Sequence, residues 1–189
     1  MTMKSIRSLA CAALLLFGGF FGVTVMLPMA QAAQSPQFGQ RLVLVAPPPT
    51  TLQPAPAYPF RRLTAAEQSV SPADWRGQKV FVNFFASWCV KCRAEHGLIT
   101  ELRAATTAPI IGVSHLDRPD DTRKMLDKVG NPYSDVLEDK SGKGGRTWGL
   151  VGVPASFILD AQGQIIWQHH GPIDAAMLKD EILPRLTAP

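Results

Sequence analysis

The stretch Lys79-Val-Phe-Val-Asn-Phe-Phe-Ala-Ser-Trp-Cys-Val-Lys-Cys-Arg-Ala-Glu-His96 joins a hydrophobic run directly to a Cys-x-x-Cys pair. Residues 79–86 are mostly β-branched or aromatic, which is typical of a buried strand. From Val90 to Ala105 the apolar residues recur with helical spacing. The sequence therefore predicts a strand, a short loop and a helix, with the two cysteines where the helix begins.

The Cys-x-x-Cys pair lies where a thiol becomes reactive. The free N–H groups and the dipole at a helix N-terminus favour an anion, and the thiolate is the attacking species in disulfide exchange. Lys91 and Arg93 add positive charge nearby. We therefore interpret Cys89 as the nucleophile and Cys92, one turn into the helix, as the resolving cysteine.

Two other interpretations of the pair are an inert disulfide and a metal-binding pair. An inert disulfide is common in exported proteins. A four-ligand zinc site would need two more ligands, and no histidine or carboxylate in the sequence has a recognisable spacing to the cysteines. The position between a strand and a helix favours redox exchange, with no metal.

The chain that follows alternates strands and helices. Strands are expected at 109–113, 154–160 and 164–169, and helices at 120–129 and 174–186, the last one capped by Asp174. The short turn at 161–163 makes the last two strands a hairpin. The order predicts an α/β fold in which a central mixed sheet is flanked by helices.

A second feature is Gly152-Val153-Pro154, about sixty residues after the cysteines. A proline at the start of a strand is ordinary. The alternative is a cis peptide bond before Pro154, which would present the backbone of Val153 to an extended substrate beside the disulfide. Position in the sequence does not decide between them, because only about 5–6% of X–Pro bonds in folded proteins are cis.

The N-terminal part of the chain predicts export. Lys4 and Arg7 precede an uncharged apolar stretch that ends in Ala30-Gln-Ala32. Residues 1–32 are thus a cleaved signal peptide or an uncleaved membrane anchor, and Cys11 is a small apolar residue within them. Residues 33–62 are rich in proline and predict an extended tether. Residues 63–189 are expected to form the domain.

Composition excludes several classes of protein. The chain has 189 residues, 46% of them hydrophobic, and a formal charge of +4, of which Lys4 and Arg7 contribute two. Such a weak charge without a basic run gives no indication of nucleic-acid binding. The sequence has no G-x-S-x-G motif, which argues against a serine hydrolase. Gly142-Lys-Gly-Gly145 lacks the spacing of a phosphate-binding loop and is expected to be an ordinary loop.

Residues 81–96, with Gly152-Val-Pro154 and Phe157-Ile-Leu-Asp160, resemble the thioredoxin superfamily. More narrowly, Cys92-Arg-Ala-Glu-His96, Gly130-Asn-Pro-Tyr133 and His170-Gly-Pro172 resemble the DsbE/CcmG family of membrane-tethered reductases of cytochrome c maturation. The resemblance covers residues 63–186 and implies a thioredoxin-like fold with a cis peptide before Pro154. The chain departs from the family at Val90 and Lys91, where proline and threonine are usual, and at Ala155, where a glutamate is usual.

The resemblance also implies roles for single residues. Asn83 stands where thioredoxin has a buried aspartate, so Glu95 is the expected base for the proton of Cys92. The alternative for Glu95 is an exposed position on the helix surface. Trp88, Val153 and Pro154 are expected to contact the substrate, and the alternative for Trp88 is a role in packing alone.

The function implied is that of a periplasmic thiol:disulfide oxidoreductase with a redox-active disulfide and no bound cofactor. Its electrons would come from a membrane carrier of the DsbD/CcdA type. They would pass to the C-x-x-C-H cysteines of apocytochrome c or to a CcmH-like thiol protein. The alternatives are a general periplasmic reductase of the TlpA type and a Cu(I)-binding chaperone that uses Cys89, Cys92 and His169 or His170.

Overall fold

The computed structural model of the protein describes residues 52–188. The predicted export segment and most of the predicted tether lie outside the described residues. Within the described part, no helix is both long enough and apolar enough to cross a membrane.

An eight-stranded mixed sheet forms the centre of the domain, in the order β1-β8-β7-β4-β5-β6-β2-β3. The pairs β4–β5 and β5–β6 are parallel, and the other neighbours are antiparallel. The strands are β1 (Gln53–Pro54), β2 (Phe60–Arg62), β3 (Ser69–Val70), β4 (Val80–Phe85), β5 (Ile110–His115), β6 (Asp135–Asp139), β7 (Ala155–Leu159) and β8 (Gln164–His170).

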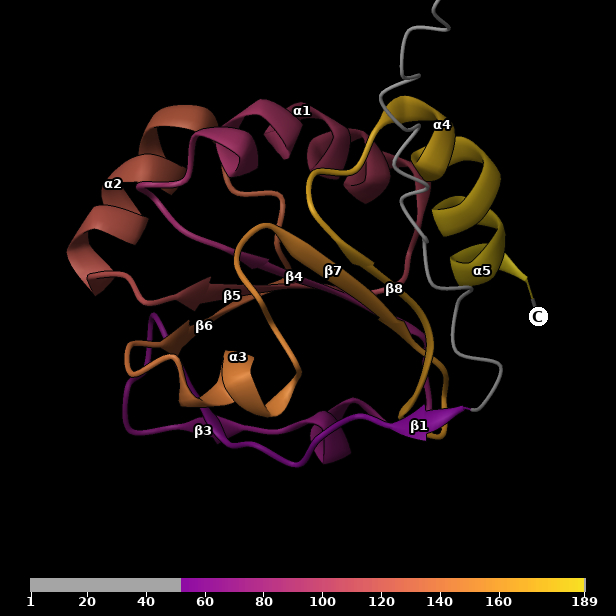
Figure 1. The fold of residues 1–189 in the computed structure, drawn as a ribbon, viewed down its shortest axis with the longest axis horizontal. Helices are drawn as coiled ribbons and strands as arrows, with labels where there is room; N and C mark the ends of the chain where they lie inside the picture. Colours follow the sequence, from indigo (N-terminus) through magenta and orange to yellow (C-terminus); the bar gives the residue numbers. More distant parts are fainter. Residues whose placement is uncertain (1–51, 189) are drawn as a thin grey trace, which may run out of the picture. The chain divides into compact units, whose positions relative to one another are not determined.

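Helices cover both faces of the sheet (Figure 1). They are η1 (Pro72–Trp75), α1 (Val90–Ala105), α2 (Pro119–Val129), α3 (Lys143–Thr147), α4 (Ala175–Met177), η2 (Leu178–Ile182) and α5 (Leu183–Thr187). The path β4-α1-β5-α2-β6 crosses the sheet in one direction, so its two crossovers place α1 and α2 on the same face. The run α4–α5 packs on that face too, and α3 lies on the other.

The core has one layer on each face of the sheet. The layer below α1, α2 and α4–α5 contains Phe81, Phe85, Ile99 and Ile158. The opposite layer is aromatic, with Phe60, Phe84, Trp148 and Phe157 in mutual contact. Strand β4 is buried along its whole length between the two layers. This burial on both faces explains why every residue of 80–85 except Asn83 is apolar.

The predicted fold class is confirmed, and most predicted elements agree with the structure. Helix α1 spans the predicted residues, and β7 and β8 form the predicted hairpin. The final helix begins at the predicted cap, where the Asp174 carboxylate accepts the N–H of Met177 at 2.8 Å. It widens to a π-helical turn at Leu178–Ile182, shortly before Pro184, which has no N–H to donate.

The structure contains one strand that the sequence did not predict, and it corrects one local prediction and the start of the domain. The acidic segment β6 is a strand, and Gly142–Gly145 is not a loop but the start of α3. The two are linked, because the Asp139 carboxylate accepts the N–H groups of Gly144 and Gly145, at 3.0 and 2.7 Å. Strands β1 and β2 lie inside the segment predicted as a tether, so the domain begins about ten residues before residue 63.

Candidate active site

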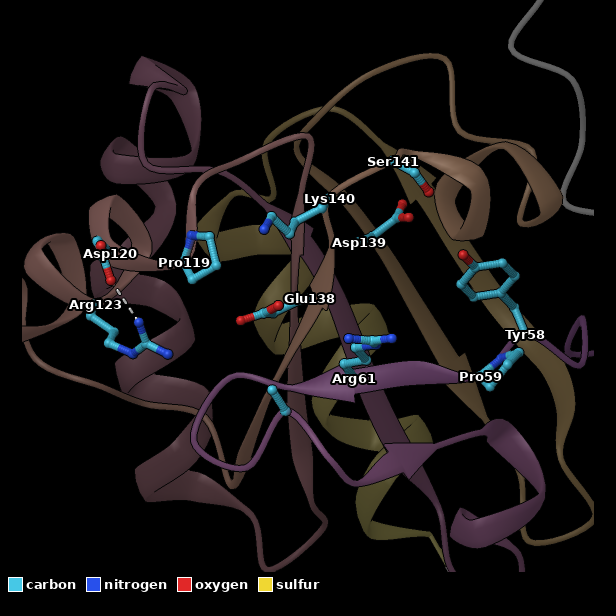
Figure 2. A pocket seen from close by; sticks show the side chains of 11 residues that line it. Tyr58, Pro59, Arg61, Pro119, Asp120, Arg123, Glu138, Asp139, Lys140 and Ser141 are labelled. Carbon is cyan, nitrogen blue, oxygen red and sulfur yellow. Dashed lines mark hydrogen bonds and ion pairs between the residues drawn. The ribbon is translucent and has the colours of Figure 1, made fainter.

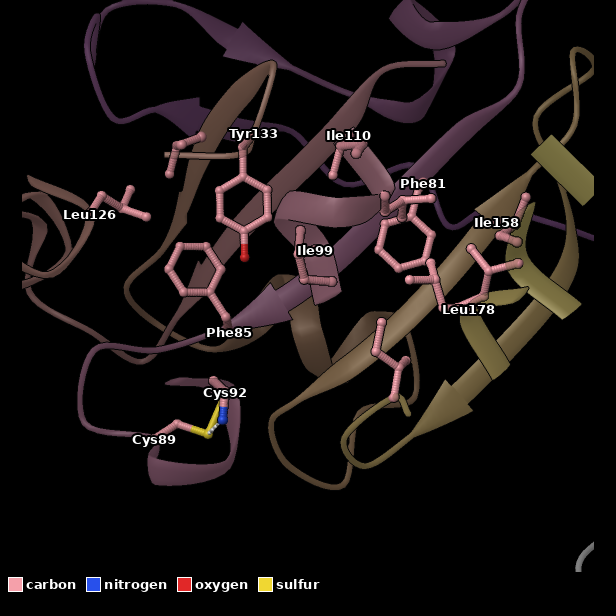
Figure 3. Close-up of a cluster of buried hydrophobic side chains, with 14 of the residues drawn as sticks. Phe81, Phe85, Cys89, Cys92, Ile99, Ile110, Leu126, Tyr133, Ile158 and Leu178 are labelled. Atoms are coloured by element: carbon pink, nitrogen blue, oxygen red, sulfur yellow. Dashed lines mark hydrogen bonds between the residues drawn. A yellow bond between two sulfur atoms is a disulfide. The ribbon is translucent and has the colours of Figure 1, made fainter. Parts of the chain in front are cut away.

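The cysteine pair lies where β4 passes into α1, at the margin of the core layer below Phe85 (Figure 3). Cys89 is the N-cap of α1, in an extended conformation with φ −82° and ψ 109°. Its Sγ atom accepts the backbone N–H of Cys92 at 3.0 Å. The two cysteines form a disulfide with a Cα–Cα distance of 5.3 Å, and both are nearly buried. The helix terminus thus points one backbone N–H, that of Cys92, at the first sulfur.

The loop before Cys89 is held by Asp117, which lies in the loop after β5. The Asp117 carboxylate accepts the N–H of Ser87 at 2.6 Å and its hydroxyl at 2.9 Å. It also accepts the hydroxyl of Thr122 in the first turn of α2, at 3.0 Å. Asp117 therefore ties the cysteine loop to the loop after β5. An aspartate just before a helix is ordinarily expected to cap that helix, so the sequence pattern did not indicate the contact of Asp117 with the cysteine loop.

Trp88 is attached to the same neighbouring loop. Its indole N–H donates to the carbonyl of Leu116 at 3.1 Å, while 56% of the residue remains exposed. The ring is thus fixed at one end and open to solvent over most of its surface, beside the first cysteine.

Val153 and Pro154 lie beside the disulfide. The peptide bond between them is cis. The Val153 carbonyl oxygen is 3.7 Å from Cys89 Sγ. The carbonyl of Pro154 accepts the N–H of Gly171 at 2.9 Å, which connects this loop to the end of β8. Residues sixty positions apart in the sequence therefore meet at the first sulfur.

Glu95 is not on an exposed helix surface. It follows Cys92 by three residues in α1, faces inward and is only 3% exposed. One carboxylate oxygen accepts the side-chain N–H of Asn83 at 3.1 Å, and the other accepts the backbone N–H of Ile173 at 2.9 Å. Burial raises the pKa of Glu95 to about 7, even though the two hydrogen bonds favour the charged form.

Asn83 connects Glu95 to a buried network that the sequence analysis did not identify. Its side-chain nitrogen also donates to the Ser156 hydroxyl at 3.1 Å, and its oxygen accepts the Tyr133 hydroxyl at 2.8 Å. Burial, and to a smaller extent the charge of Glu95, raises the pKa of Tyr133 well above its ordinary value. Tyr133 belongs to the Gly130–Tyr133 motif shared with the DsbE/CcmG family, so the sequence marked this residue. Ser156 belongs to no motif, so nothing in the sequence indicated its contact with Asn83.

The histidines considered as metal ligands have other contacts. His96 Nε2 lies 3.0 Å from the carbonyl oxygen of Gly130, His169 stacks on Trp167, and His170 lies edge-on to Phe157. Between residues 52 and 188, no group of three or more His, Cys, Asp or Glu side chains is placed to hold a metal ion.

A pocket of about 560 Å³ lies away from the disulfide, between β2, the end of β6 and the start of α2 (Figure 2). Charges of both signs line it, among them Arg61, Glu138 and Lys140. Arg123 in its wall is already bound to Asp120 at 2.8 Å and to the carbonyl of Leu63 at 2.7 Å. Neither cysteine lines this pocket, so it is not part of the redox site.

Comparison with known proteins identifies relatives of the whole domain. The model of the AhpC/TSA family matches residues 52–168. The thiol:disulfide interchange protein CycY of Rhizobium leguminosarum bv. viciae is 30% identical over 179 residues, which cover 95% of this chain and 93% of CycY. The thiol:disulfide interchange protein HelX of Rhodobacter capsulatus is 37% identical over 141 residues, with 73% of this chain and 79% of HelX covered.

A solved structure gives the same result. The crystal structure of a putative thiol:disulfide interchange protein DsbE from Chlorobium tepidum superposes with a TM-score of 0.60 and 27% identity. The match covers 71% of this chain and 96% of that one. The similarity therefore extends over nearly all the residues that the structure describes.

Proposed function

The chain belongs to the AhpC/TSA family and is a thiol:disulfide oxidoreductase of the DsbE type, and within that activity we propose that it reduces protein disulfides during cytochrome c maturation. The observation that carries this proposal is the arrangement at the helix N-terminus. Cys89 Sγ receives an N–H from Cys92 and lies 3.7 Å from the backbone of Val153, while a buried carboxyl group follows Cys92 by one turn.

The reaction begins with the reduced pair. The Cys89 thiolate attacks one sulfur of the substrate disulfide, a mixed disulfide forms, and the first substrate thiolate leaves. Cys92 then loses its proton and attacks Cys89 Sγ. The Cys89–Cys92 disulfide forms, and the second substrate thiolate leaves. Two electrons pass from the cysteine pair to the substrate, and a membrane donor of the DsbD/CcdA type returns two electrons to the pair.

Glu95 accepts the proton of Cys92 in this proposal. Residues three apart on a helix lie on the same side, and an acceptor is most effective when its pKa is close to the working pH. Burial, with a pKa of about 7, supports this role for Glu95. Asn83 and Ile173, which both donate to the carboxylate, are positioning residues.

Substrate binding is assigned to Trp88, Val153 and Pro154. Trp88 precedes Cys89 in the chain and is more than half exposed, and the carbonyl of Val153 is 3.7 Å from Cys89 Sγ. An extended segment that carries a cysteine can lie between them, with an apolar side chain against the indole ring.

The location and partners follow from the predicted export segment and from the family resemblance. With residues 1–32 as signal peptide or anchor and the following residues as tether, the domain works in the periplasm. The substrate is apocytochrome c or a CcmH-like thiol protein. Val90, Lys91 and Ala155 depart from the pattern of the DsbE/CcmG family and favour, as a second candidate, a general reductase of the TlpA type.

Trapping with Cys92→Ala tests both candidates. Without the resolving cysteine, we expect the full-length chain, expressed in its own host, to remain joined to its substrate through Cys89. The adduct is measured by non-reducing electrophoresis and identified by mass spectrometry. Apocytochrome c or a thiol protein that serves it supports the first candidate, and unrelated exported proteins support the second.

Cys89→Ala is the matched control for trapping and should give no adduct. If Cys92→Ala forms no mixed disulfide with any protein, the proposed exchange reaction is wrong.

A further inference from the structure

The surroundings of Cys89 expose an unusual amount of apolar surface. Trp88, Val90 and Leu116, which we call the apolar rim, are 56%, 70% and 50% exposed. Trp88 and Val90 are the chain neighbours of Cys89, and the indole N–H of Trp88 reaches the carbonyl of Leu116. Large exposed apolar side chains that gather in one place indicate a surface that a partner covers.

Cations surround this rim. Lys91 and Arg93 are exposed in the first turn of α1, and Arg93 Nη1 donates to the carbonyl of Ser87 at 2.5 Å. Arg146 lies beside Leu116 in space. Arg146 Nη1 and Leu116 Cδ2 are 3.2 and 2.8 Å from the position that a side-chain carbon on Gly142 would take.

These cations are not paired with carboxylates in the described part of the chain. None of Lys91, Arg93 and Arg146 forms an ion pair between residues 52 and 188. Asp117, which is next to Leu116, keeps its negative charge, but its oxygens accept hydrogen bonds from Ser87 and Thr122 and not from these cations. Glu95 is buried and is not part of the exposed surface. The surface around Cys89 is therefore apolar, and its three cations (Lys91, Arg93 and Arg146) outnumber its one carboxylate, Asp117.

We propose that this surface docks an extended polypeptide segment in which the target cysteine is next to an apolar side chain and is flanked by acidic residues. The proposal rests on the proposed function and adds the chemistry of the substrate. The apolar side chain covers the apolar rim, and the carboxylates pair with Lys91 and Arg146. A polypeptide fits better than an anionic lipid surface, because the Val153 carbonyl and the disulfide lie within the same surface.

Charge complementarity of this kind acts mainly on the rate of association, and it weakens with salt. Three disulfide-linked peptides with the same Cys-Leu centre and acidic, neutral or basic flanks provide the test. Stopped-flow reduction by the reduced protein should be faster for the acidic than for the basic peptide, by on the order of tenfold at low ionic strength. The difference should shrink when NaCl is raised from about 20 mM to about 300 mM.

The double variant Lys91→Gln/Arg146→Gln should lose most of the preference for the acidic peptide. Lys91 lies beside Cys89 and can alter its reactivity, so each rate is divided by the rate with uncharged hydroxyethyl disulfide. Lys128→Gln/Arg103→Gln is the matched control. It also removes one lysine and one arginine charge, but in the last turns of α2 and α1. It should leave the preference unchanged.

Equal normalised rates for the acidic and basic peptides, or a preference that survives Lys91→Gln/Arg146→Gln, would overturn the proposal. The proposal would also be overturned by two results together. The wild-type protein, but not the double variant, would co-sediment with phosphatidylglycerol vesicles, and the acidic and basic peptides would be reduced at equal rates. Hydroxyethyl disulfide separates this proposal from the proposed function. If it is reduced without peptide discrimination, only the docking proposal fails, and if it is not reduced at all, the exchange activity fails.

Discussion

Asn83 and Glu95 form one buried polar unit, in which Glu95 follows Cys92 by three residues in α1. An amide in the middle of β4 can donate to Glu95 and Ser156 while it accepts from Tyr133, so every polar atom of its side chain is used. A carboxylate at residue 83 would face Glu95 at about hydrogen-bond distance and repel it. The asparagine therefore leaves a single titratable carboxyl group in the unit, and this group is Glu95.

Glu95→Gln tests the proton transfer at the residue scale. We expect Cys92 to displace a small thiol from a mixed disulfide with Cys89 about a hundredfold more slowly near pH 7, because the base is missing. Attack by Cys89 on a disulfide should change little. Both steps are measured by stopped-flow fluorescence between pH 6 and 8.5.

Glu101→Gln is the matched control, since it changes an exposed glutamate in the same helix. Displacement by Cys92 at the wild-type rate in Glu95→Gln would show that another group takes the proton.

At the scale of elements, β5 determines how closely the tyrosine of the network approaches the sheet. Gly112 in β5 is paired with Asn83 in β4. The rings of Tyr133 and Phe85 stack with a centroid distance of 4.9 Å, and both lie against Gly112. A side-chain carbon on Gly112 would lie 2.7 Å from Tyr133 and 2.9 Å from Phe85. The absence of a side chain there allows Tyr133 to reach Asn83.

Gly112→Ala should therefore lower the free energy of unfolding by about 1–3 kcal/mol, because two buried rings must move. Gly97→Ala, in α1, meets nothing within 4 Å and should raise it by about 0.5–1 kcal/mol through the helix propensity of alanine. Urea unfolding of the oxidised protein measures both. A Gly112→Ala variant as stable as the wild type would contradict the tight packing of the Tyr133–Phe85 stack.

At the scale of the whole molecule, the buried Glu95 links folding to pH. Its pKa is about 7 in the folded protein, above the ordinary value of 4.5, so the folded state binds the proton more tightly than the unfolded state. Stability is therefore highest when Glu95 is protonated, and it falls as pH rises from about 4.5 to about 7. The full loss amounts to about 3 kcal/mol.

The oxidised protein is suited to this measurement, because disulfide-bonded cysteines do not titrate. Wild type and Glu95→Gln are unfolded with urea between pH 4.5 and 8. The difference between their free energies of unfolding should change with pH, because only the wild type has the Glu95 carboxyl group. Burial lowers the pKa of His170, which acts in the opposite direction, but His170 is present in both proteins and cancels. Parallel curves for the two proteins would mean that Glu95 has an ordinary pKa.

Several parts of the fold could not be predicted because their stability comes from distant partners. Segment β6 carries three acidic residues and does not have an apolar pattern, yet it pairs with β5 on one side and with β2 on the other. Its Asp139 is tolerated in the interior because two N–H groups of α3 and the ring of His115 bind it. Phe60, within a proline-rich stretch, is fully buried against Phe84.

The sequence by itself determined the central elements and the chemistry. The spacing of apolar residues along the chain identifies β4, α1 and the β7–β8 hairpin. The position of two cysteines at the start of a helix identifies a thiol–disulfide site. Only the tertiary structure decided what surrounds that site. Val153, Asp117 and Ile173 come from three separate loops at the edge of the sheet where β4 ends, whereas Tyr133 reaches Asn83 from the opposite edge, just before β6 begins. Burial of Glu95 also results from this packing, because desolvation depends on neighbours that a local pattern does not contain.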